Sequence, residues 1–456
     1  MSDEHDFEAN RLTGRLRRYA KVGTGIGGVA AKFASQRYLG ATTDRNVNAV
    51  ALAAALGGLK GPLMKVAQML ATIPEALPPE YAEELAKLQS NAPAMGWPFV
   101  KRRMAVELGP QWQERFGAFE HQASASASLG QVHRAMTKDG KALACKLQYP
   151  DMESAVEADL TQLGLIFAVH RRMDPAIDTR NMGIEIGARL REELDYEREA
   201  RHIRLYTDML VKIPSVKVPE VYPDFSTKRL LAMEWLEGEP VFDFRDASLK
   251  VRNRIARAMF RAWWHPFARY GVIHGDPHLG NYTVFRDEGE VAGINLLDYG
   301  CIRIFPPRFV QGVIDLYSGL RDGDHDLIVH AYESWGFTNL RNDIIDVLNM
   351  WAQFIFGPLL DDRVRSVADG IKPGEYGRRE AFQVHKALKE IGPVTLPREF
   401  VFMDRAAIGL GGVFLHLGAR LNFSKAFRDE IENFSLAALT TRQSKALEGA
   451  GLEIPE

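Results

Sequence analysis

The sequence predicts an α+β fold of two lobes preceded by a helical extension. Residues 118–148 contain two short β-rich runs around Asp139-Gly140, a dipeptide that favours a hairpin turn. Residues after Glu239 read as mostly helical, with interruptions at 271–285 and 291–300. Strands early in the chain and helices late in the chain are typical of two segregated lobes.

The extension precedes these lobes. Apolar residues at helical spacing predict helices over 46–110, which Pro74 and Pro78-Pro79 interrupt. Residues 49–59 are the best candidate for a membrane span, but they are far too short to cross a bilayer, so we interpret them as a buried helix. The predicted domains are a basic segment at 1–45, the helical extension at 46–115, an N-lobe with inserted helices at 116–237, a C-lobe at 238–443 and a tail at 444–456.

Composition restricts the class of protein. The chain has 456 residues, of which 46% are hydrophobic and 25% charged, and its net charge is −2. These values are ordinary for a globular protein and predict no nucleic-acid partner. The only two cysteines, Cys145 and Cys301, are expected to be small buried residues in a reducing compartment. With an acidic, polar start unlike a secretory signal, they favour the cytoplasm, with peripheral contact to the inner membrane or a mitochondrial matrix location left open.

The chemistry is concentrated in two loops. Asp276 is followed five residues later by Asn281, which is the interval found in the catalytic loop of protein kinases. In that loop the aspartate faces the substrate hydroxyl and the asparagine holds magnesium. Asp298 comes after an apolar strand and before Tyr299-Gly300, which is similar to the metal-binding D-F-G of kinases. We therefore expect Asn281 and Asp298 to bind Mg²⁺.

The remaining parts of a nucleotide site precede these loops. Lys146 lies on an alternating strand, where a kinase places the lysine that contacts phosphates. The acidic helix after it carries Asp195 and Glu199 four residues apart on one face, whereas Glu193 points elsewhere. The backbone of a hinge at 233–238, with Glu234 and Leu236, is expected to bind the adenine edge.

Each of these features has an ordinary structural explanation when taken alone. A strand lysine is usually at an edge, and a glutamate-rich helix usually has a solvated face. His274 and His278 look like a metal pair, but loop histidines more often orient backbone. Only the order of the motifs along the chain predicts a kinase-like fold with ATP and Mg²⁺ as cofactors.

The motifs together resemble those of the UbiB-like atypical kinases, a family linked to coenzyme Q biosynthesis. The resemblance extends from about Gly14 to Phe434 and is closest to the mitochondrial-type members. It implies an atypical kinase or ATPase that supports ubiquinone biosynthesis at a membrane. The segments that carry it are SASLGQVH, CKLQYP, ELDYEREA, HGDPHLGN and LLDYG.

The resemblance also implies a role for individual residues. Lys65 and Gln68 belong to a K-x-G-Q motif that gates the site, with Ala67 in place of its glycine. Glu193 of the E-x-D motif interacts with the extension helix that carries Lys65 and Gln68, and Glu199 pairs with Lys146. Asp276 takes the catalytic-base position. The phosphates are covered by a loop rich in alanine and serine, in place of a kinase's glycines, which comprises Ala125, Ser126, Ala127, Ser128, Leu129 and Gly130.

Two other functions remain open at this point. One is transfer of phosphate to a small molecule or lipid, and the other is a non-catalytic scaffold that uses ATP as a switch. The expected partners are ATP, an anionic membrane surface, quinone-precursor lipids and proteins of ubiquinone biosynthesis. Residues 11–37 carry seven basic and no acidic side chains, which is consistent with lipid contact or with a solvated helix face.

Overall fold

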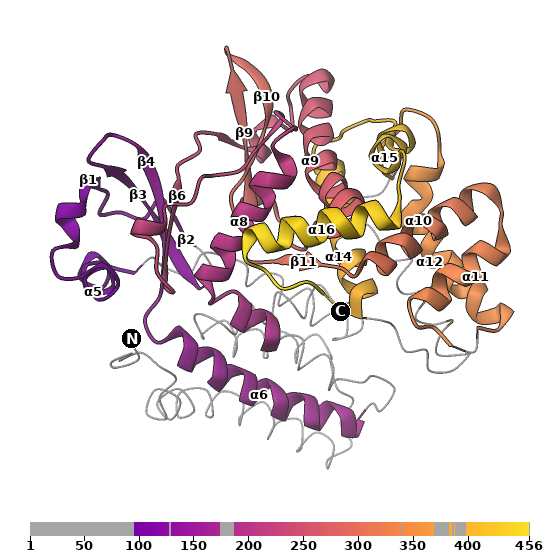
Figure 1. The fold of residues 1–456 in the computed structure, drawn as a ribbon, viewed down its shortest axis with the longest axis horizontal. Helices are drawn as coiled ribbons and strands as arrows, with labels where there is room; N and C mark the ends of the chain where they lie inside the picture. Colours follow the sequence, from indigo (N-terminus) through magenta and orange to yellow (C-terminus); the bar gives the residue numbers. More distant parts are fainter. Residues whose placement is uncertain are drawn as a thin grey trace, which may run out of the picture. The chain divides into compact units, whose positions relative to one another are not determined.

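The computed structural model describes residues 95–126, 129–173, 187–338, 340–368, 383, 384, 387 and 398–455. The chain divides into two compact units, of which the first comprises residues 1–198 and 222–235 and the second 199–221 and 236–456. Both units contain helices and sheets, as the predicted α+β class requires (Figure 1).

The first unit is built on an antiparallel sheet of order β1-β3-β4-β6, with β2 paired to β3. The predicted hairpin is confirmed, because Gly140 adopts a φ of 85° between β3 and β4. That left-handed conformation favours glycine. The strands are β1 (Phe116–Phe119), β2 (Ala125–Ser126), β3 (Gly130–Thr137), β4 (Ala142–Gln148) and β6 (Leu230–Glu234).

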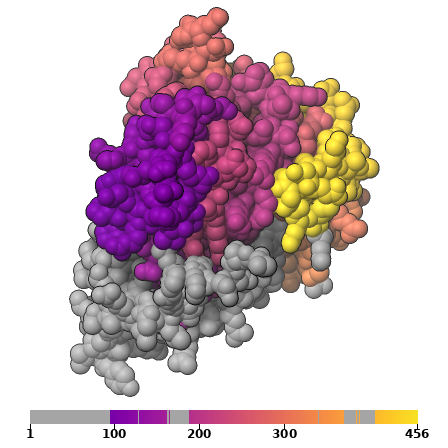
Figure 2. Space-filling view, turned by 60° about the vertical axis from the view of Figure 1, so that its left-hand side comes forward, coloured from indigo at the N-terminus to yellow at the C-terminus, as the bar shows by residue number. Residues whose placement is uncertain are grey.

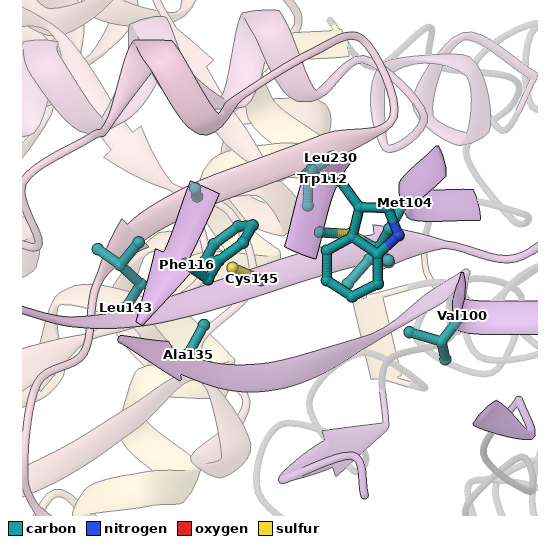
Figure 3. Packing of buried hydrophobic residues seen from close by; sticks show 10 residues of the cluster. Val100, Met104, Trp112, Phe116, Ala135, Leu143, Cys145 and Leu230 are labelled. Atoms are coloured by element: carbon teal, nitrogen blue, oxygen red, sulfur yellow. The ribbon is translucent and has the colours of Figure 1, made fainter. Parts of the chain in front are cut away.

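The core of this unit lies on one face of the sheet. Leu143, Cys145 and Leu147 of β4 pack there with Val100 and Met104 of α5 (Trp97–Leu108), as Figure 3 shows in part. Because side chains alternate along a strand, Lys146 points to the opposite face. The side chains of β4 therefore alternate between the two faces of the sheet, as predicted. They do not alternate between buried and exposed, because β4 is a central strand that is buried from Leu143 to Gln148.

The acidic helix expected around Glu193 is interrupted in the structure, which corrects that prediction. A helical segment ends at residue 192, residues 193–194 form a turn, and α8 (Tyr196–Leu210) begins afterwards. The Asp195 carboxylate accepts a hydrogen bond from Arg198 N at 2.8 Å, so it caps the N-terminus of α8. Asp195 and Glu199 therefore do not share a face of one continuous helix. The other long helix of this unit is α6 (Met152–Met173).

The second unit contains a four-stranded sheet of order β5-β10-β9-β7 and a two-stranded sheet of β8 and β11. The buried helix α9 (Leu249–Tyr270) starts at a Ser248 cap and ends at Gly271, whose φ is 65°. Its strands are β5 (Val216–Lys217), β7 (Glu239–Pro240), β8 (Val272–His274), β9 (Tyr282–Asp287), β10 (Glu290–Leu296) and β11 (Ile302–Ile304).

Helices complete the second unit. Glu430 of α15 accepts hydrogen bonds from Arg261 at 3.2 Å and His265 at 2.8 Å, which fixes α15 against α9. The C-terminal helix α16 lies at the surface, in yellow in Figure 2. These helices are α10 (Pro307–Asp322), α11 (His325–Ser334), α12 (Asn342–Leu360), α14 (Arg398–His416), α15 (Phe423–Ile431) and α16 (Leu436–Ala450). Short 3₁₀ helices are η2 (Trp112–Arg115), η3 (Pro223–Phe225), η4 (Val241–Phe244) and η5 (Leu279–Asn281).

Among the described residues, no helix is both long enough and apolar enough to span a membrane. The candidate span at 49–59 and the basic segment at 1–45 lie outside the described residues.

Candidate nucleotide and metal site

The predicted catalytic loop follows directly from β8 in the second unit. His274 is the last residue of β8 and pairs with Ile302 of β11. The next residue, Gly275, donates its N–H to Cys301 O at 2.7 Å, and a Cβ at Gly275 would lie 3.0 Å from that same oxygen. The β8–β11 pair therefore fixes the backbone immediately before Asp276, whose side chain is half-buried.

His274 connects the catalytic loop to the predicted metal loop. Its Nε2 lies 2.7 Å from Asp298 O, and its Nδ1 accepts from Asp276 N at 3.2 Å. Because a carbonyl only accepts, Nε2 must carry the proton, and the ring is neutral. Burial lowers the pKa of His274, against the opposing effects of Asp298 and Asp276. One buried imidazole thus sets the spacing of the two loops.

The histidines orient backbone, as the more conservative interpretation of the sequence predicted. His278 Nδ1 accepts from Gly280 N at 3.1 Å, and so shapes the turn between Asp276 and Asn281. Among the described residues, no group of three or more His, Cys, Asp or Glu side chains is arranged to hold a metal ion. His274 and His278 each use ring nitrogens for hydrogen bonds to the main chain.

Strand register places Asn281 opposite Leu297, the residue that precedes Asp298. Tyr282 of β9 pairs with Leu296 of β10, and Leu297 N donates to Asn281 O at 2.9 Å. Asn281 is therefore opposite the residue that precedes Asp298. The antiparallel β9–β10 pair thus places the backbone of Asn281 beside the residue before Asp298, and the joint binding of Mg²⁺ by the two side chains stays a prediction.

The donor atoms of this pair suit magnesium. Asn281 Nδ2 donates to Asp276 O at 3.0 Å, which turns the amide oxygen away from that contact. Asp298 Oδ1 accepts from Gly300 N at 3.0 Å, which fixes the carboxylate. A carboxylate and an amide oxygen are ligands that Mg²⁺ accepts, and Mg²⁺ takes its remaining ligands from phosphates and water. The residues present therefore fit this ion.

Helix α8 holds the segment after Asp298. Glu199 Oε1 accepts from Tyr299 N at 3.3 Å, and His202 Nδ1 lies 3.0 Å from Tyr299 O. The buried Tyr299 ring packs against Tyr206 with ring centroids 5.3 Å apart. The side chain of Glu199 is 2% exposed, so its carboxylate is in a strongly desolvated position. The structure thus gives Glu199 a contact to the metal loop that the sequence did not suggest.

Lys146 belongs to the first unit, where it lies between Val132 and Leu231 in the sheet. Its Nζ lies 5.3 Å from the centre of the Tyr196 ring, a cation–π contact. Glu199 belongs to the second unit, so its pairing with Lys146 stays a prediction. Glu193 lies in the turn before α8, and Glu234 ends β6 opposite Leu143.

The loop that is expected to cover the phosphates begins and ends in the sheet of the first unit. Ala125 and Ser126 form β2, which pairs with Val132 and Gln131 of β3. Leu129 is buried, and its carbonyl accepts from Tyr149 N at 3.1 Å. Ala127, Ser128, Lys65 and Gln68 lie outside the described residues, and Leu236 is the first residue of the second unit after β6.

Several supporting residues were missed by the sequence analysis. Gln148 donates to Leu194 O at 2.6 Å, which holds the turn of the E-x-D motif against β4. Arg103 of α5 donates to Gln148 O at 3.3 Å and to Tyr149 O at 3.2 Å. Gln131 hydrogen-bonds both the N–H and the carbonyl of Met95. The signal in the sequence was a polar residue inside an otherwise apolar run. That pattern indicates a polar contact but does not identify the partner.

Cys145 is fully buried, as expected, and burial raises its pKa to about 12. Cys301 is only partly buried, which corrects the prediction for that residue. Its Sγ accepts from Arg303 Nη2 at 3.5 Å, so it keeps a polar contact beside the catalytic loop.

Comparison with known proteins shows which family the chain resembles. Residues 87–332 match the family model of the ABC1 atypical kinase-like domain. AarF domain-containing protein kinase 1 of Xenopus tropicalis is 28% identical over 375 residues, which cover 80% of this chain and 69% of that protein. The mitochondrial atypical kinase COQ8 of Saccharomyces cerevisiae is 28% identical over 320 residues, which cover 68% of this chain and 63% of COQ8.

Two further similarities extend this result. The chloroplastic protein ACTIVITY OF BC1 COMPLEX KINASE 8 of Arabidopsis thaliana is 26% identical, over 79% of this chain and 51% of its own. The chain thus spans only part of the length of these curated relatives. A solved complex of Rv3197 with erythromycin from Mycobacterium tuberculosis has a TM-score of 0.59 at 27% identity, covering 83% of this chain and 94% of that one. These matches confirm the resemblance to the UbiB-like atypical kinases and the kinase-like fold.

Proposed function

Because the chain belongs to the ABC1 atypical kinase-like family, we propose that it binds ATP with Mg²⁺ and hydrolyses it slowly in support of ubiquinone biosynthesis. The observation that carries the proposal is the imidazole of His274, which bonds to the backbones of both Asp276 and Asp298. An arrangement that fixes two loop aspartates relative to each other is what phosphoryl transfer requires, since its catalysis is mainly positioning and electrostatics.

Each residue has a defined task in this proposal. Asn281 and Asp298 hold Mg²⁺, which supplies positive charge to the β- and γ-phosphates. Lys146 contacts the α- and β-phosphates, and Glu199 holds Lys146. Asp276, at the catalytic-base position, orients the water that attacks the γ-phosphorus and gives ADP and inorganic phosphate.

The remaining proposed parts regulate or complete the site. The loop from Ala125 to Gly130 covers the phosphates, and its alanines restrict backbone freedom compared with a glycine-rich loop. The backbone at Glu234 and Leu236 binds the base. Lys65, Gln68 and Glu193 gate access by a protein substrate.

The deciding experiment is an ATPase assay on the purified full chain, with and without anionic liposomes and a phenolic quinone precursor. We expect Mg²⁺-dependent release of phosphate that rises with liposomes, and its loss in Asp276→Asn. Asp324→Asn serves as a matched control, because that aspartate caps α11 by accepting from Leu327 N at 3.1 Å. Equal turnover in wild type and Asp276→Asn would refute the assignment of Asp276.

A second candidate is transfer of phosphate to a small molecule or lipid. The half-buried Asp276, whose N–H donates to His274 Nδ1, could equally accept the proton of an organic hydroxyl. Phosphate recovered on the quinone precursor or on lipid, in place of free phosphate, would favour this candidate. A non-catalytic, ATP-switched lipid scaffold would instead keep its biological activity in Asp276→Asn.

The cellular setting is proposed from two relatives, of which COQ8 is mitochondrial and ACTIVITY OF BC1 COMPLEX KINASE 8 is chloroplastic. We propose a peripheral location on an anionic inner membrane, with quinone-precursor lipids and ubiquinone biosynthesis proteins as partners. Fractionation of cells that express the tagged full chain, followed by a salt wash of the membranes, tests this location.

A further inference from the structure

Asn295 is a fully buried amide on β10, three residues before Asp298. Its Nδ2 donates to Glu237 O at 3.0 Å and to Thr283 Oγ1 at 2.9 Å. Because a carbonyl can only accept, the contact with Glu237 determines which end of the amide carries the nitrogen. The orientation of the Asn295 side chain therefore follows from the chemistry of its partner.

Stability does not explain an amide at this position. Asn295 Oδ1 is buried and has no hydrogen-bond partner within the part of the chain that the structure describes. A buried acceptor without a donor is unfavourable, and an apolar residue of the same size would avoid that cost. The neighbours Ile294 and Leu296 are apolar and buried, as is usual for such a strand. We therefore explain the presence of the amide by its hydrogen bond to the backbone carbonyl of Glu237.

That backbone is the end of the segment expected to bind the base. Glu237 follows Leu236 directly, and Gly238 comes next. A Cβ at Gly238 would clash with Thr283 Oγ1 and lie 2.7 Å from Asn295 Nδ2. The absence of a side chain at Gly238 thus allows the main chain to lie directly on the amide. Two independent features, the hydrogen bond and the glycine, fix the Glu237–Gly238 peptide.

We propose that Asn295 is a positioning residue that determines purine specificity by fixing the backbone from Leu236 to Gly238. This inference rests on the proposed ATP binding. The edge of adenine presents an N–H donor at N6 and an acceptor at N1, whereas guanine presents an acceptor at O6 and a donor at N1. A main chain of fixed orientation matches one pattern and opposes the other, because mismatched polar groups are left unpaired. A main chain that can rotate discriminates less.

The test is calorimetric binding of MgATP and MgGTP to the full chain carrying Asn295→Leu. We expect the dissociation constant for MgGTP divided by that for MgATP to fall roughly tenfold, mainly because ATP binds more weakly. The melting temperature without nucleotide should stay the same or rise. Thr283→Val is the matched control, since it removes the second acceptor but leaves the contact to Glu237. Its ATP preference should stay near that of the wild type.

Gly238→Ala provides a second route if Asn295→Leu fails to fold, because the added methyl displaces the same peptide. It should reduce the ATP preference in the same direction. An unchanged ratio in either folded variant, or a wild type without any preference for ATP over GTP, overturns the inference and leaves the proposed function intact. A wild type that does not bind MgATP overturns the proposed function first.

Discussion

At the scale of single residues, hydrogen bonds to the main chain determine the geometry of the candidate site. His274, Asn281 and Glu199 each bond to a backbone atom of the catalytic or metal loop. A substitution in this region can therefore remove the functional group itself, or it can remove a hydrogen bond that holds the loop in place.

The first prediction concerns Asp298. Asp298→Asn keeps the size of the side chain but removes a negative ligand, so Mg²⁺-dependent stabilisation by ATP should be lost. The measurement is the shift in melting temperature on addition of MgATP. Asp322→Asn is the control, because Asp322 pairs with the adjacent Arg321 at the surface, and exposed pairs contribute little. Full stabilisation of Asp298→Asn by MgATP would contradict the metal assignment.

The second prediction concerns pH and His133. Burial lowers the pKa of His133, whose Nδ1 lies 2.8 Å from Glu120 O and whose Nε2 lies 2.7 Å from Gln131 Nε2. A protonated ring would turn a donor toward the Gln131 amide. The unfolded chain therefore takes up the proton first, and stability should decrease as the pH falls below about 6.5.

His133→Asn tests this prediction, since its amide can still donate to Glu120 O but does not titrate. The melting temperature of this variant should depend less on pH over the range from about 7.5 to about 5.5. Some dependence should remain, because burial also lowers the pKa of His274. An identical pH dependence in the wild type and the variant would exclude His133 as a contributor.

At the scale of elements, the β3–β4 hairpin continues from the loop proposed to cover the phosphates, and Gly130 lies where the two meet. A Cβ at this position would clash with Leu147 O and lie 2.9 Å from Tyr196 OH. Gly130→Ala should therefore lower the free energy of unfolding by about 2 kcal/mol, because the strand pair must separate locally. Chemical denaturation measures this change.

Gly164→Ala is the matched control for Gly130→Ala. Gly164 lies in α6, and among the described residues no atom outside its own helix would lie within 4 Å of a Cβ there. Because alanine is favoured over glycine inside a helix, this change should stabilise the protein by up to about 1 kcal/mol. Opposite signs for the two substitutions would separate the close approach at Gly130 from a general effect of losing glycine.

At the scale of the whole molecule, the open question is membrane contact. Residues 11–37 lie outside the described residues, but they carry seven basic side chains in a chain with a net charge of −2. Each basic side chain near an anionic surface contributes about 1 kcal/mol, so we expect binding to anionic but not to neutral liposomes.

Replacing Arg15, Arg17 and Arg18 together with Glu should abolish co-flotation and leave MgATP binding intact. Salt should weaken binding of the wild type. Unchanged flotation of the triple variant would assign these arginines to a solvated surface.

The sequence by itself determined the features that depend on short-range spacing. The Asp276–Asn281 interval, the Asp298-Tyr299-Gly300 segment and the Asp139-Gly140 turn are each encoded within a few neighbouring residues. Their order along the chain then predicted the kinase-like class, which the family match confirms. Local spacing succeeds here because the backbone of a turn or catalytic loop is largely set by its own residues.

The tertiary structure alone decided which distant residues support these segments. One helical segment ends at residue 192 and Asp195 caps the next, a break that the periodicity of charges over 189–203 does not encode. The contact from Asn295 to Glu237 and the contacts from Gln131 to Met95 join residues far apart in sequence. Such partners are fixed by strand register and by the packing of helices against sheets, which depend on the whole fold. Hydrophobic periodicity indicates which face of an element is buried, but not which polar atom it meets there.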